Sequence, residues 1–300
     1  MKTICNVCPH RCNLEEGQTG LCYARTVDKG QSKPIEQDES LECTTIPANY
    51  GQITSIALDP IEKKPLYHFH GGSQIISVGS YGCNLKCPFC QNVEISLSDN
   101  RSRTNVEYLS PEKLVSIAKE YVPYGNIGVA FTYNEPLICY EYVLDTSKLL
   151  KENGLYSVVV TNGSTYPWVV DKIGPYVDAM NIDLKSFSDE YYRKVLKGNL
   201  NNTKEFIRCA LKYCHVELTT LVVSGKDDEL SENVSVSDME RICSWIKDLE
   251  EEFDKKIPFH ISRFFPRSQY MDRRPTDIDH MRELYSIASQ ELEYVYLGNC

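Results

Sequence analysis

The feature of this sequence that most constrains its fold is an alternation of short apolar runs with longer amphipathic segments, which begins near residue 75. Continuous apolar runs of this length are typical of strands that are covered on both faces. Strands that alternate with helices predict βα units and a parallel sheet. The runs lie at residues 75–79, 126–132, 156–161, 177–185, 216–223 and 258–262, with a short closing run at 294–298.

The segments between these runs carry helix signals. In "SPEKLVSIAKEYV", Ser110 can cap the helix and Pro111 suits its first turn. Gly154 is a natural left-handed stop for the next helix. We expect helices near residues 110–122, 139–152, 165–174, 188–197, 202–213, 234–250 and 276–289. We therefore predict an α/β fold, a partial (β/α)6 barrel of parallel strands over residues 71–300. A doubly wound open sheet is the alternative, because periodicity alone does not report whether the sheet closes into a barrel.

The first 70 residues have a different composition. They contain five of the thirteen cysteines, show no long helical pattern, and include "ANYGQITSIAL", which we interpret as a pair of strands. We predict that residues 1–70 form a small cysteine-rich N-terminal module.

Charge and hydropathy limit the classes of function. A net charge of −10 argues against a protein that binds duplex nucleic acid, because neutralising phosphates needs a surplus of Lys and Arg. No apolar run approaches the roughly 18 residues that span a bilayer, and the start "MKTICNVCPH" does not resemble a signal peptide. We therefore expect a cytoplasmic protein. Its thiols then point to metal, cluster or catalytic use rather than to disulfides.

Three of the cysteines lie within "GSYGCNLKCPFCQN", directly after the first apolar run. Cys83, Cys87 and Cys90 have the spacing C-x3-C-x2-C, and no fourth cysteine is nearby. Three thiolates would leave one iron of a 4Fe-4S cluster free to coordinate a small molecule and pass it an electron. The position also fits, because active sites of parallel barrels lie at the C-terminal ends of the strands. The alternative is a zinc site that borrows a remote ligand, such as His68, His70 or an N-terminal cysteine.

A second set of cysteines lies at the N-terminus. Cys5, Cys8, Cys12 and Cys22 have the spacing C-x2-C-x3-C-x9-C. Four soft ligands can close a zinc site or hold a second iron–sulfur cluster for electron relay. Both options stay open at this point, with unligated structural thiols as a third. The nearby glycines and the small amount of apolar surface favour zinc. Cys43 and Cys300 remain without an assigned role.

"CNLKCPFC" resembles the cluster motif of the radical S-adenosylmethionine (SAM) superfamily, with Phe89 in the aromatic position before the third cysteine. "TYNEP" (132–136) occupies the place of the motif that receives the methionine amino group, so the resemblance implies that role for Asn134 and Glu135. "TNG" (161–163) and "DLK" (183–185) resemble elements of glycyl-radical-activating enzymes. This likeness implies SAM contacts for Thr161, Asn162, Asp183 and Lys185, the last two with the ribose and the carboxylate.

The resemblance extends over nearly the whole chain. The stretches "CNVCPHRC", "DPIEKKPLYHF", "FTYNEP", "NIDLKSF" and "FHISRFFP" are similar to the radical SAM component of the AmmeMemoRadiSam system, which itself is similar to pyruvate formate-lyase-activating enzyme. "FHISRFFP" places His260 and Arg263 near the expected mouth of the barrel, where they would hold a SAM carboxylate or a substrate anion. Residues 59–69 are charged, which is typical of an exposed loop, whereas the resemblance implies a cover or docking segment.

The resemblance implies a reaction as well. The reduced 4Fe-4S cluster would cleave SAM to methionine and a 5′-deoxyadenosyl radical, which abstracts a hydrogen atom from the substrate. The expected partners are SAM, an external electron donor and a residue of a partner protein. Nucleic acid and membrane are not expected partners. Two alternatives remain: a radical SAM enzyme that acts on a small molecule, and a zinc-binding interaction protein without radical chemistry.

Overall fold

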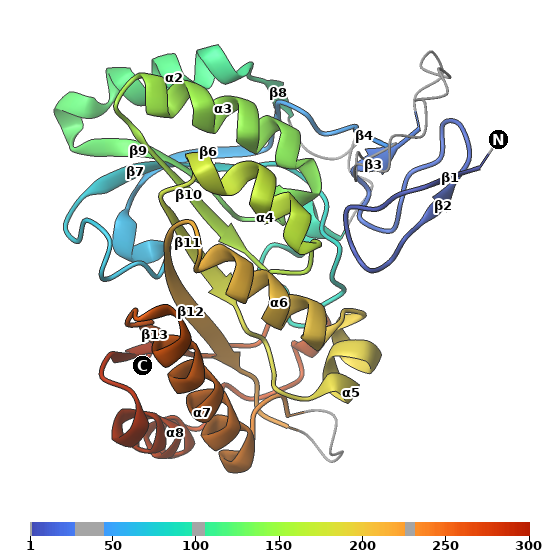
Figure 1. Cartoon of the computed structure of the whole chain (residues 1–300). Coiled ribbons are helices and arrows are strands. Elements are labelled where there is room, and N and C mark those ends of the chain that lie inside the picture. The colour runs from blue at the N-terminus through green and yellow to red at the C-terminus, as the bar shows by residue number, and fades with distance from the viewer. Residues whose placement is uncertain (1, 28–44, 98–105, 226–231) are drawn as a thin grey trace.

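An eight-stranded sheet forms the centre of the computed structural model, which describes residues 2–27, 45–97, 106–225 and 232–300. The order of the strands in the sheet is β14-β13-β12-β11-β10-β9-β7-β6 (Figure 1). Their bounds are β6 Ser55–Pro60, β7 Gln74–Gly79, β9 Asn126–Phe131, β10 Tyr156–Thr161, β11 Ala179–Asp183, β12 His215–Val222, β13 Phe259–Arg263 and β14 Val295–Gly298. The strands predicted from the apolar runs are therefore confirmed.

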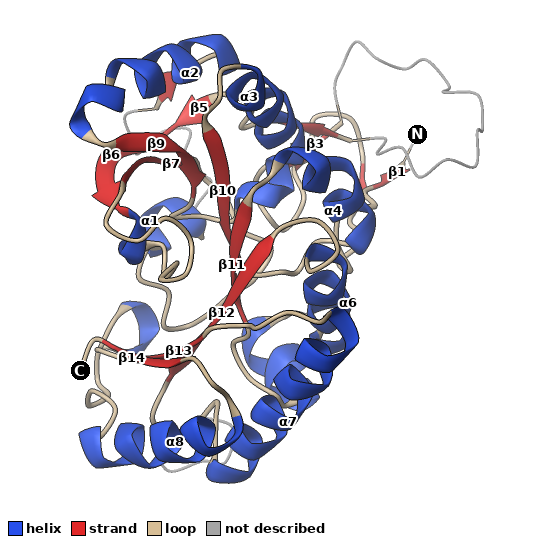
Figure 2. Cartoon of the chain, turned by 60° about the vertical axis from the view of Figure 1, so that its left-hand side comes forward, coloured by secondary structure: helices blue, strands red, loops and turns tan. Residues whose placement is uncertain are grey.

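The pairing of these strands distinguishes the two predicted architectures. From β7 to β14 every neighbouring pair is parallel and the spatial order follows the chain, whereas β6 adds to β7 in antiparallel orientation. A doubly wound sheet would reverse its strand order at a switch point, so that alternative is wrong. In the described part of the chain β6 and β14 stay at opposite edges, and the curved sheet carries its helices on the outside (Figure 2). The fold is the predicted partial barrel.

Helices follow the strands as expected. They are α1 Val93–Ser96, α2 Pro111–Glu120, α3 Tyr140–Glu152, α4 Pro167–Ile173, α5 Asp189–Tyr191, α6 Leu200–Ala210, α7 Val236–Phe253 and α8 Ile278–Glu291. Ser110 caps α2 by accepting the Lys113 N–H, and Gly154 takes a φ of 67° after α3. Both sequence-based helix boundaries are thus confirmed by their predicted mechanism.

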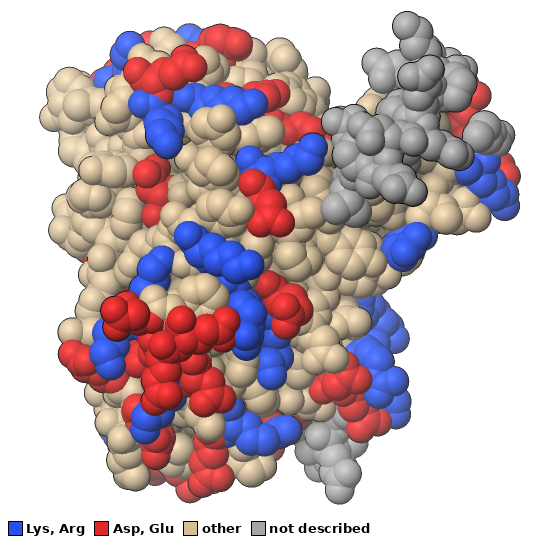
Figure 3. All heavy atoms as spheres, in the orientation of Figure 1, with Lys and Arg blue, Asp and Glu red and all other residues tan. Residues whose placement is uncertain are grey.

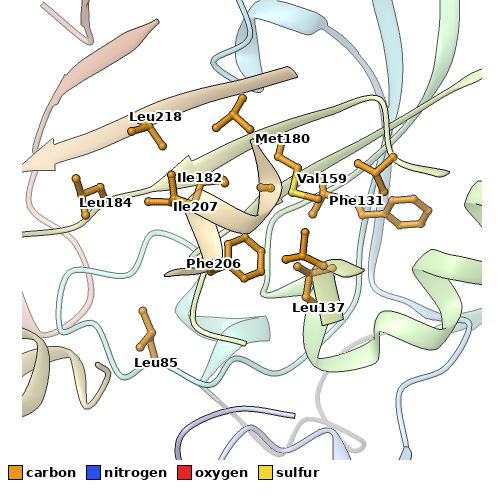
Figure 4. Close-up of a cluster of buried hydrophobic side chains, with 14 of the residues drawn as sticks. Leu85, Phe131, Leu137, Val159, Met180, Ile182, Leu184, Phe206, Ile207 and Leu218 are labelled. Atoms are coloured by element: carbon orange, nitrogen blue, oxygen red, sulfur yellow. The ribbon is translucent and has the colours of Figure 1, made fainter. Parts of the chain in front are cut away.

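The main hydrophobic core lies between the outer face of the sheet and the helices. Met180 and Ile182 of β11 and Leu218 of β12 face Phe206 and Ile207 of α6, and all five side chains are fully buried (Figure 4). At roughly 1.5–3 kcal/mol for each large apolar side chain, this layer is the main source of stability. It leaves the C-terminal strand ends free to carry polar side chains.

The N-terminal module consists of loops and very short strands. β1 Thr3–Ile4 pairs with β2 Asn13–Leu14, and β3 Arg25–Thr26 pairs with β4 Ile46–Pro47. Two strands begin within residues 48–58 as expected, but they do not pair with each other. β5 Gln52–Ile53 pairs with β8 Glu107–Tyr108, and β6 joins the central sheet. The expected module of residues 1–70 therefore contributes its last strand to the barrel.

The surface carries charges of both signs. On the face shown in Figure 3, acidic side chains are densest over the lower half, where α7 and α8 lie. Ion pairs such as Arg208–Glu252, at 2.6 Å, cross between neighbouring helices. In the ranges that the structure describes, none of the helices is both long enough and apolar enough to cross a membrane.

Candidate functional site

The three motif cysteines lie on a loop at the C-terminal end of β7. Gly82 begins this loop with a φ of 89°, and a side chain there would collide with the carbonyl of Cys22. The Leu85 N–H donates to the Cys83 sulfur at 3.4 Å. Glycine tolerates this positive φ, and the resulting sharp turn brings the loop against the N-terminal module.

Burial shapes the chemistry of these thiols. Burial raises the pKa of Cys87 to about 12, although the nearby Lys185 ammonium opposes the shift. Burial and the Glu135 charge raise the pKa of Cys83 as well. A buried thiol stays neutral on its own, whereas a coordinated thiol loses its proton. Cys83 and Cys87 therefore need a cationic group to become thiolates.

The Glu135 carboxylate joins two strand ends. It is 1% exposed and accepts hydrogen bonds from the Thr161 hydroxyl and the Asn162 N–H, both at 2.8 Å. The Leu137 N–H donates to it at 3.0 Å. Burial raises the pKa of Glu135 to about 7, because it outweighs these hydrogen bonds. Most of its hydrogen-bonding capacity is thus used within the chain.

The two asparagines of the expected SAM-binding motifs hold the cysteine loop. Asn134 accepts the Ser80 N–H at 3.0 Å and donates to the Gly82 carbonyl at 3.1 Å. Asn162 donates to the Asn84 side chain at 2.9 Å and to the Cys83 sulfur at 3.5 Å. The structure therefore brings the ends of β9 and β10 directly to the cysteines.

At the end of β11, Asp183 and Lys185 form an ion pair of 2.8 Å. Burial lowers the pKa of Lys185, but the charges of Asp183 and Cys87 outweigh it and raise the pKa overall. The expected ligands at "DLK" are therefore adjacent to the cysteine loop. A carboxylate and an ammonium at this place can hold polar groups of a bound molecule.

A buried hydroxyl nearby has no partner. Tyr191 of α5 is 1% exposed, and among the described residues its hydroxyl makes no hydrogen bond. Burial, followed by the charges of Tyr270 and Cys87, raises its pKa. Buried polar groups are nearly always hydrogen-bonded. An unpaired Tyr191 hydroxyl near Cys87 therefore fits a site that binds a cofactor or ligand. The "DEYYRKVL" stretch gave no sequence signal for this role.

The side chains gathered at this end of the sheet are of the chemical types that bind an iron–sulfur cluster. Three thiols on one loop are soft ligands, with the Tyr191 hydroxyl free to donate to whatever binds there. Across the described ranges, no three His, Cys, Asp or Glu side chains are gathered closely enough to hold a metal ion. That criterion concerns a single ion, whereas a 4Fe-4S cluster would bind each thiolate to a different iron. The residues fit the group by type and position.

Phe89 and Arg263 also lie at this end of the sheet. Phe89 is buried, and its ring centroid is 6.2 Å from that of Tyr270. The Arg263 Nε donates to the Thr276 carbonyl at 2.7 Å. Both side chains thus contact the segment that follows β13, which also bonds the loop through the Gln269 N–H and the Pro88 carbonyl.

His260 lies elsewhere, and the expectation that it is near the mouth is not met. It is the second residue of β13, and its ring nitrogen is 2.6 Å from the buried Glu217 carboxylate. The same carboxylate accepts the N–H groups of Tyr67 and His68, at 3.0 and 2.7 Å. His260 does lie on the predicted strand. Its height within the barrel, however, depends on the register of β13, and side chains alternate between the two faces of a strand.

The N-terminal cysteines lie against the same loop. A His10 ring nitrogen is 2.7 Å from the Asn84 carbonyl, and the Lys86 ammonium donates to the Leu21 carbonyl at 2.8 Å. Cys5, Cys8 and Cys22 are buried and Cys12 is partly buried, whereas Cys43 lies outside the described residues. Sequence reasoning missed Asn84, which sits inside the cysteine motif and bridges the module to Asn162.

Comparison with known proteins identifies the family of this chain. A family profile described as the radical SAM superfamily matches residues 77–234. The chain is 35% identical over 300 residues to the protein MJ0808 of Methanocaldococcus jannaschii, covering 99% of this chain and 81% of that protein. It is 26% identical over 151 residues to pyruvate formate-lyase 1-activating enzyme of Escherichia coli, covering 49% and 61% of the two chains.

A solved structure shows the same fold. SuiB of Streptococcus suis, bound to S-adenosylmethionine, superposes with a TM-score of 0.53 at 11% identity. The match covers 75% of this chain and 46% of SuiB, so the chain spans about half the length of that protein. The profile, the relatives and the parallel sheet agree, and the chain belongs to the radical SAM superfamily.

Proposed function

We propose that this enzyme cleaves SAM reductively and abstracts a hydrogen atom from a residue of a partner protein. The superfamily uses a 4Fe-4S cluster and SAM as cofactors. The observation that carries the proposal is the position of Cys83, Cys87 and Cys90 on one loop, bonded to the neighbouring strand ends through Asn134 and Asn162. The cluster, once bound, supplies the electron that breaks the sulfonium bond of SAM.

The residues of the chain have distinct tasks in this proposal. The three cysteines hold the cluster, and the Tyr191 hydroxyl donates a hydrogen bond to the bound group. Asp183 and Lys185 bind the ribose and the carboxylate of SAM. The backbone around Asn134 and Glu135 receives the amino group, because most side-chain acceptors there are used internally. Phe89 excludes water from one side of the site.

The proposal that the substrate is a partner protein rests on the similarity of this chain to an activating enzyme. The Escherichia coli relative is named as an activating enzyme of another enzyme. The stretches "TNG" and "DLK" of this chain resemble elements of glycyl-radical-activating enzymes. Residues 61–69 cover the N-terminal end of the barrel, where Ile61 and Leu66 are fully buried against the sheet. A substrate therefore approaches from the C-terminal side, where the cysteines lie, and a protein segment can reach that side from solution.

The test is anaerobic reconstitution with iron and sulfide, followed by reduction with dithionite in the presence of SAM. We expect the visible absorption of an iron–sulfur cluster and the release of 5′-deoxyadenosine. Zinc in both cysteine sets without 5′-deoxyadenosine would contradict the proposal.

An extract of source cells grown in deuterated medium, separated by size, then identifies the substrate class. Deuterium in 5′-deoxyadenosine from the protein fraction supports a protein substrate, and deuterium from the small-molecule fraction alone contradicts it.

We also infer that Cys5, Cys8, Cys12 and Cys22 form a second metal site. The Cys8 thiol is buried, and the neighbouring Cys22 and Cys12 add to the burial that raises its pKa to about 12. Buried thiols that influence one another in this way are stabilised when a soft cation binds them.

The Cys12→Ala variant tests this second site, because Cys12 is only partly buried and its loss disturbs packing least. Metal analysis should show one zinc fewer per chain than in the wild type, with iron unchanged. A loss of iron instead would identify a second cluster. Cys300→Ala is the control, since Cys300 is exposed. Identical zinc and iron contents in Cys12→Ala and the wild type would show that these thiols bind no metal.

A further inference from the structure

The charged "DPIEKKPLYHF" segment covers the N-terminal end of the barrel. Ile61 and Leu66 are fully buried and pack with Ile75, Ala130 and Val158 of the sheet. The Asn181 side chain donates to the Pro65 carbonyl at 2.8 Å. The interpretation of this segment as an exposed loop is therefore wrong for its centre, which closes the floor of the barrel.

One charged residue of the segment is buried with it. Lys64 is 3% exposed, and its ammonium is 2.9 Å from Asp59 Oδ2. The same oxygen accepts the Tyr133 hydroxyl at 2.8 Å, and the ammonium lies 4.9 Å from the centre of the Tyr133 ring. A buried lysine is costly unless it is paired, so these three side chains form one interdependent unit.

Tyr133 belongs to the loop that follows β9, directly before Asn134 and Glu135. Its φ of 70° is unfavourable for a bulky residue and persists only where surrounding contacts impose it. Those contacts come from both ends: the Tyr133 carbonyl accepts from the Asn92 side chain at 2.7 Å, and the hydroxyl is held by Asp59.

Gly79 makes room for the Tyr133 ring. A Cβ at Gly79 would lie 2.8 Å from the ring Cδ2, so no side chain fits beside the tyrosine. Tyr133 therefore reaches from the cysteine side of the barrel to Asp59 of β6, which pairs with Ile75 near the start of β7. The floor segment and the expected SAM-binding loop are linked through one side chain.

We propose that Asp59 and Lys64 are positioning residues that act through Tyr133 to hold residues 132–136 in the conformation that binds the methionine end of SAM. This inference rests on the proposed function. It gives the "DPIEKKP" motif a role in SAM affinity that its distance from the cysteines in the sequence does not suggest. The floor of the barrel is then part of the cofactor-binding apparatus.

The Tyr133→Phe variant tests this link in the reconstituted protein. SAM binding is titrated by the change in the cluster's electron paramagnetic resonance signal, and SAM cleavage is measured at saturating SAM. We expect the Kd for SAM to rise about five-fold, the equivalent of one lost buried hydrogen bond, with the cleavage rate at saturation changed less than about two-fold. Asp59→Asn should raise the Kd similarly. The Asp59→Asn, Tyr133→Phe double variant should bind SAM no more weakly than the weaker-binding single variant, because the two substitutions remove the same link.

Tyr50→Phe is the matched control. The Tyr50 hydroxyl donates to Asp145 Oδ2 at 2.7 Å, a phenol–carboxylate bond of similar length on the helical side of the sheet. The Tyr50→Phe substitution should lower thermal stability by as much as Tyr133→Phe does, without changing the Kd for SAM. If Tyr133→Phe binds SAM as the wild type does, Tyr133 is only structural and the inference is wrong. A wild-type protein that neither bound nor cleaved SAM would instead refute the proposed function and this inference with it.

Discussion

We expect the Cys87→Ala protein to lose reductive SAM cleavage while its barrel stays folded. Cys87 is one of the three proposed cluster ligands and is 8% exposed, beside Lys185. Loss of a cluster ligand should lower the yield of 5′-deoxyadenosine by more than about 100-fold, since even changes beyond the first ligands cost about 10- to 100-fold. The free energy of unfolding should fall by only about 1 kcal/mol, because alanine leaves a small void.

The control for this variant is Cys243→Ala. Cys243 is fully buried in α7, away from the motif loop, and behaves as a small apolar side chain. It should cost similar stability and leave both iron content and SAM cleavage unchanged. If Cys87→Ala still turned SAM over at the wild-type rate, the assignment of the cluster to Cys83, Cys87 and Cys90 would be wrong.

The second large effect is on stability, at the floor of the barrel. Glu217 is completely buried, and its carboxylate accepts hydrogen bonds from His215 and His260 and from the N–H groups of Tyr67 and His68. In Glu217→Gln, the amide NH2 replaces one acceptor oxygen and faces donors. We expect a loss of about 3 kcal/mol in the free energy of unfolding, measured by urea denaturation near neutral pH.

The contribution of Glu217 to the free energy of unfolding should depend on pH. Burial raises its pKa, but the two histidines and the two N–H groups outweigh burial and lower it to about 2. Because the folded pKa lies below the unfolded value of about 4.3, the carboxylate stabilises the fold above pH ~5. That contribution is lost as the pH falls toward 2, so the stability difference between wild type and Glu217→Gln should shrink over the same range.

Glu291→Gln is the control for this experiment. Glu291 pairs with Lys247 at 3.1 Å, and both side chains are about half exposed. An exposed pair contributes at most about 1 kcal/mol, so this variant should unfold close to the wild type at every pH. Equal unfolding free energies for Glu217→Gln and the wild type at neutral pH would show that the Glu217 contacts do not hold the floor segment.

Much of the fold could be predicted from the sequence because it rests on local signals. The apolar runs gave every parallel strand, and Ser110 and Gly154 marked helix ends through their own backbone chemistry. The two strands expected near residues 48–58 form, but they do not pair with each other, for a physical reason. Extended segments indicate strands but not their partners, and β6 gained more by covering the open edge of β7.

The candidate site divides in the same way. The cysteine spacing and the positions of "TYNEP", "TNG" and "DLK" after successive strands pointed to one end of the barrel, where the structure places them. The roles of individual side chains were not visible in the sequence. The sequence did not show that the Asn134 and Glu135 side chains hold the cysteine loop and the next strand, or that His260 lies at the floor.

The sequence by itself determined the order of the βα units and the soft-ligand chemistry of Cys83, Cys87 and Cys90, because strand periodicity and ligand spacing are properties of neighbouring residues. Only the tertiary structure decided which polar groups meet. Thr161 reaches Glu135 across 26 positions, Tyr133 reaches Asp59 across 74, and His68 reaches Glu217 across 149. Such contacts depend on register and on the closure of long loops, which no local pattern encodes. The floor that the charged segment forms is therefore a property of the folded barrel.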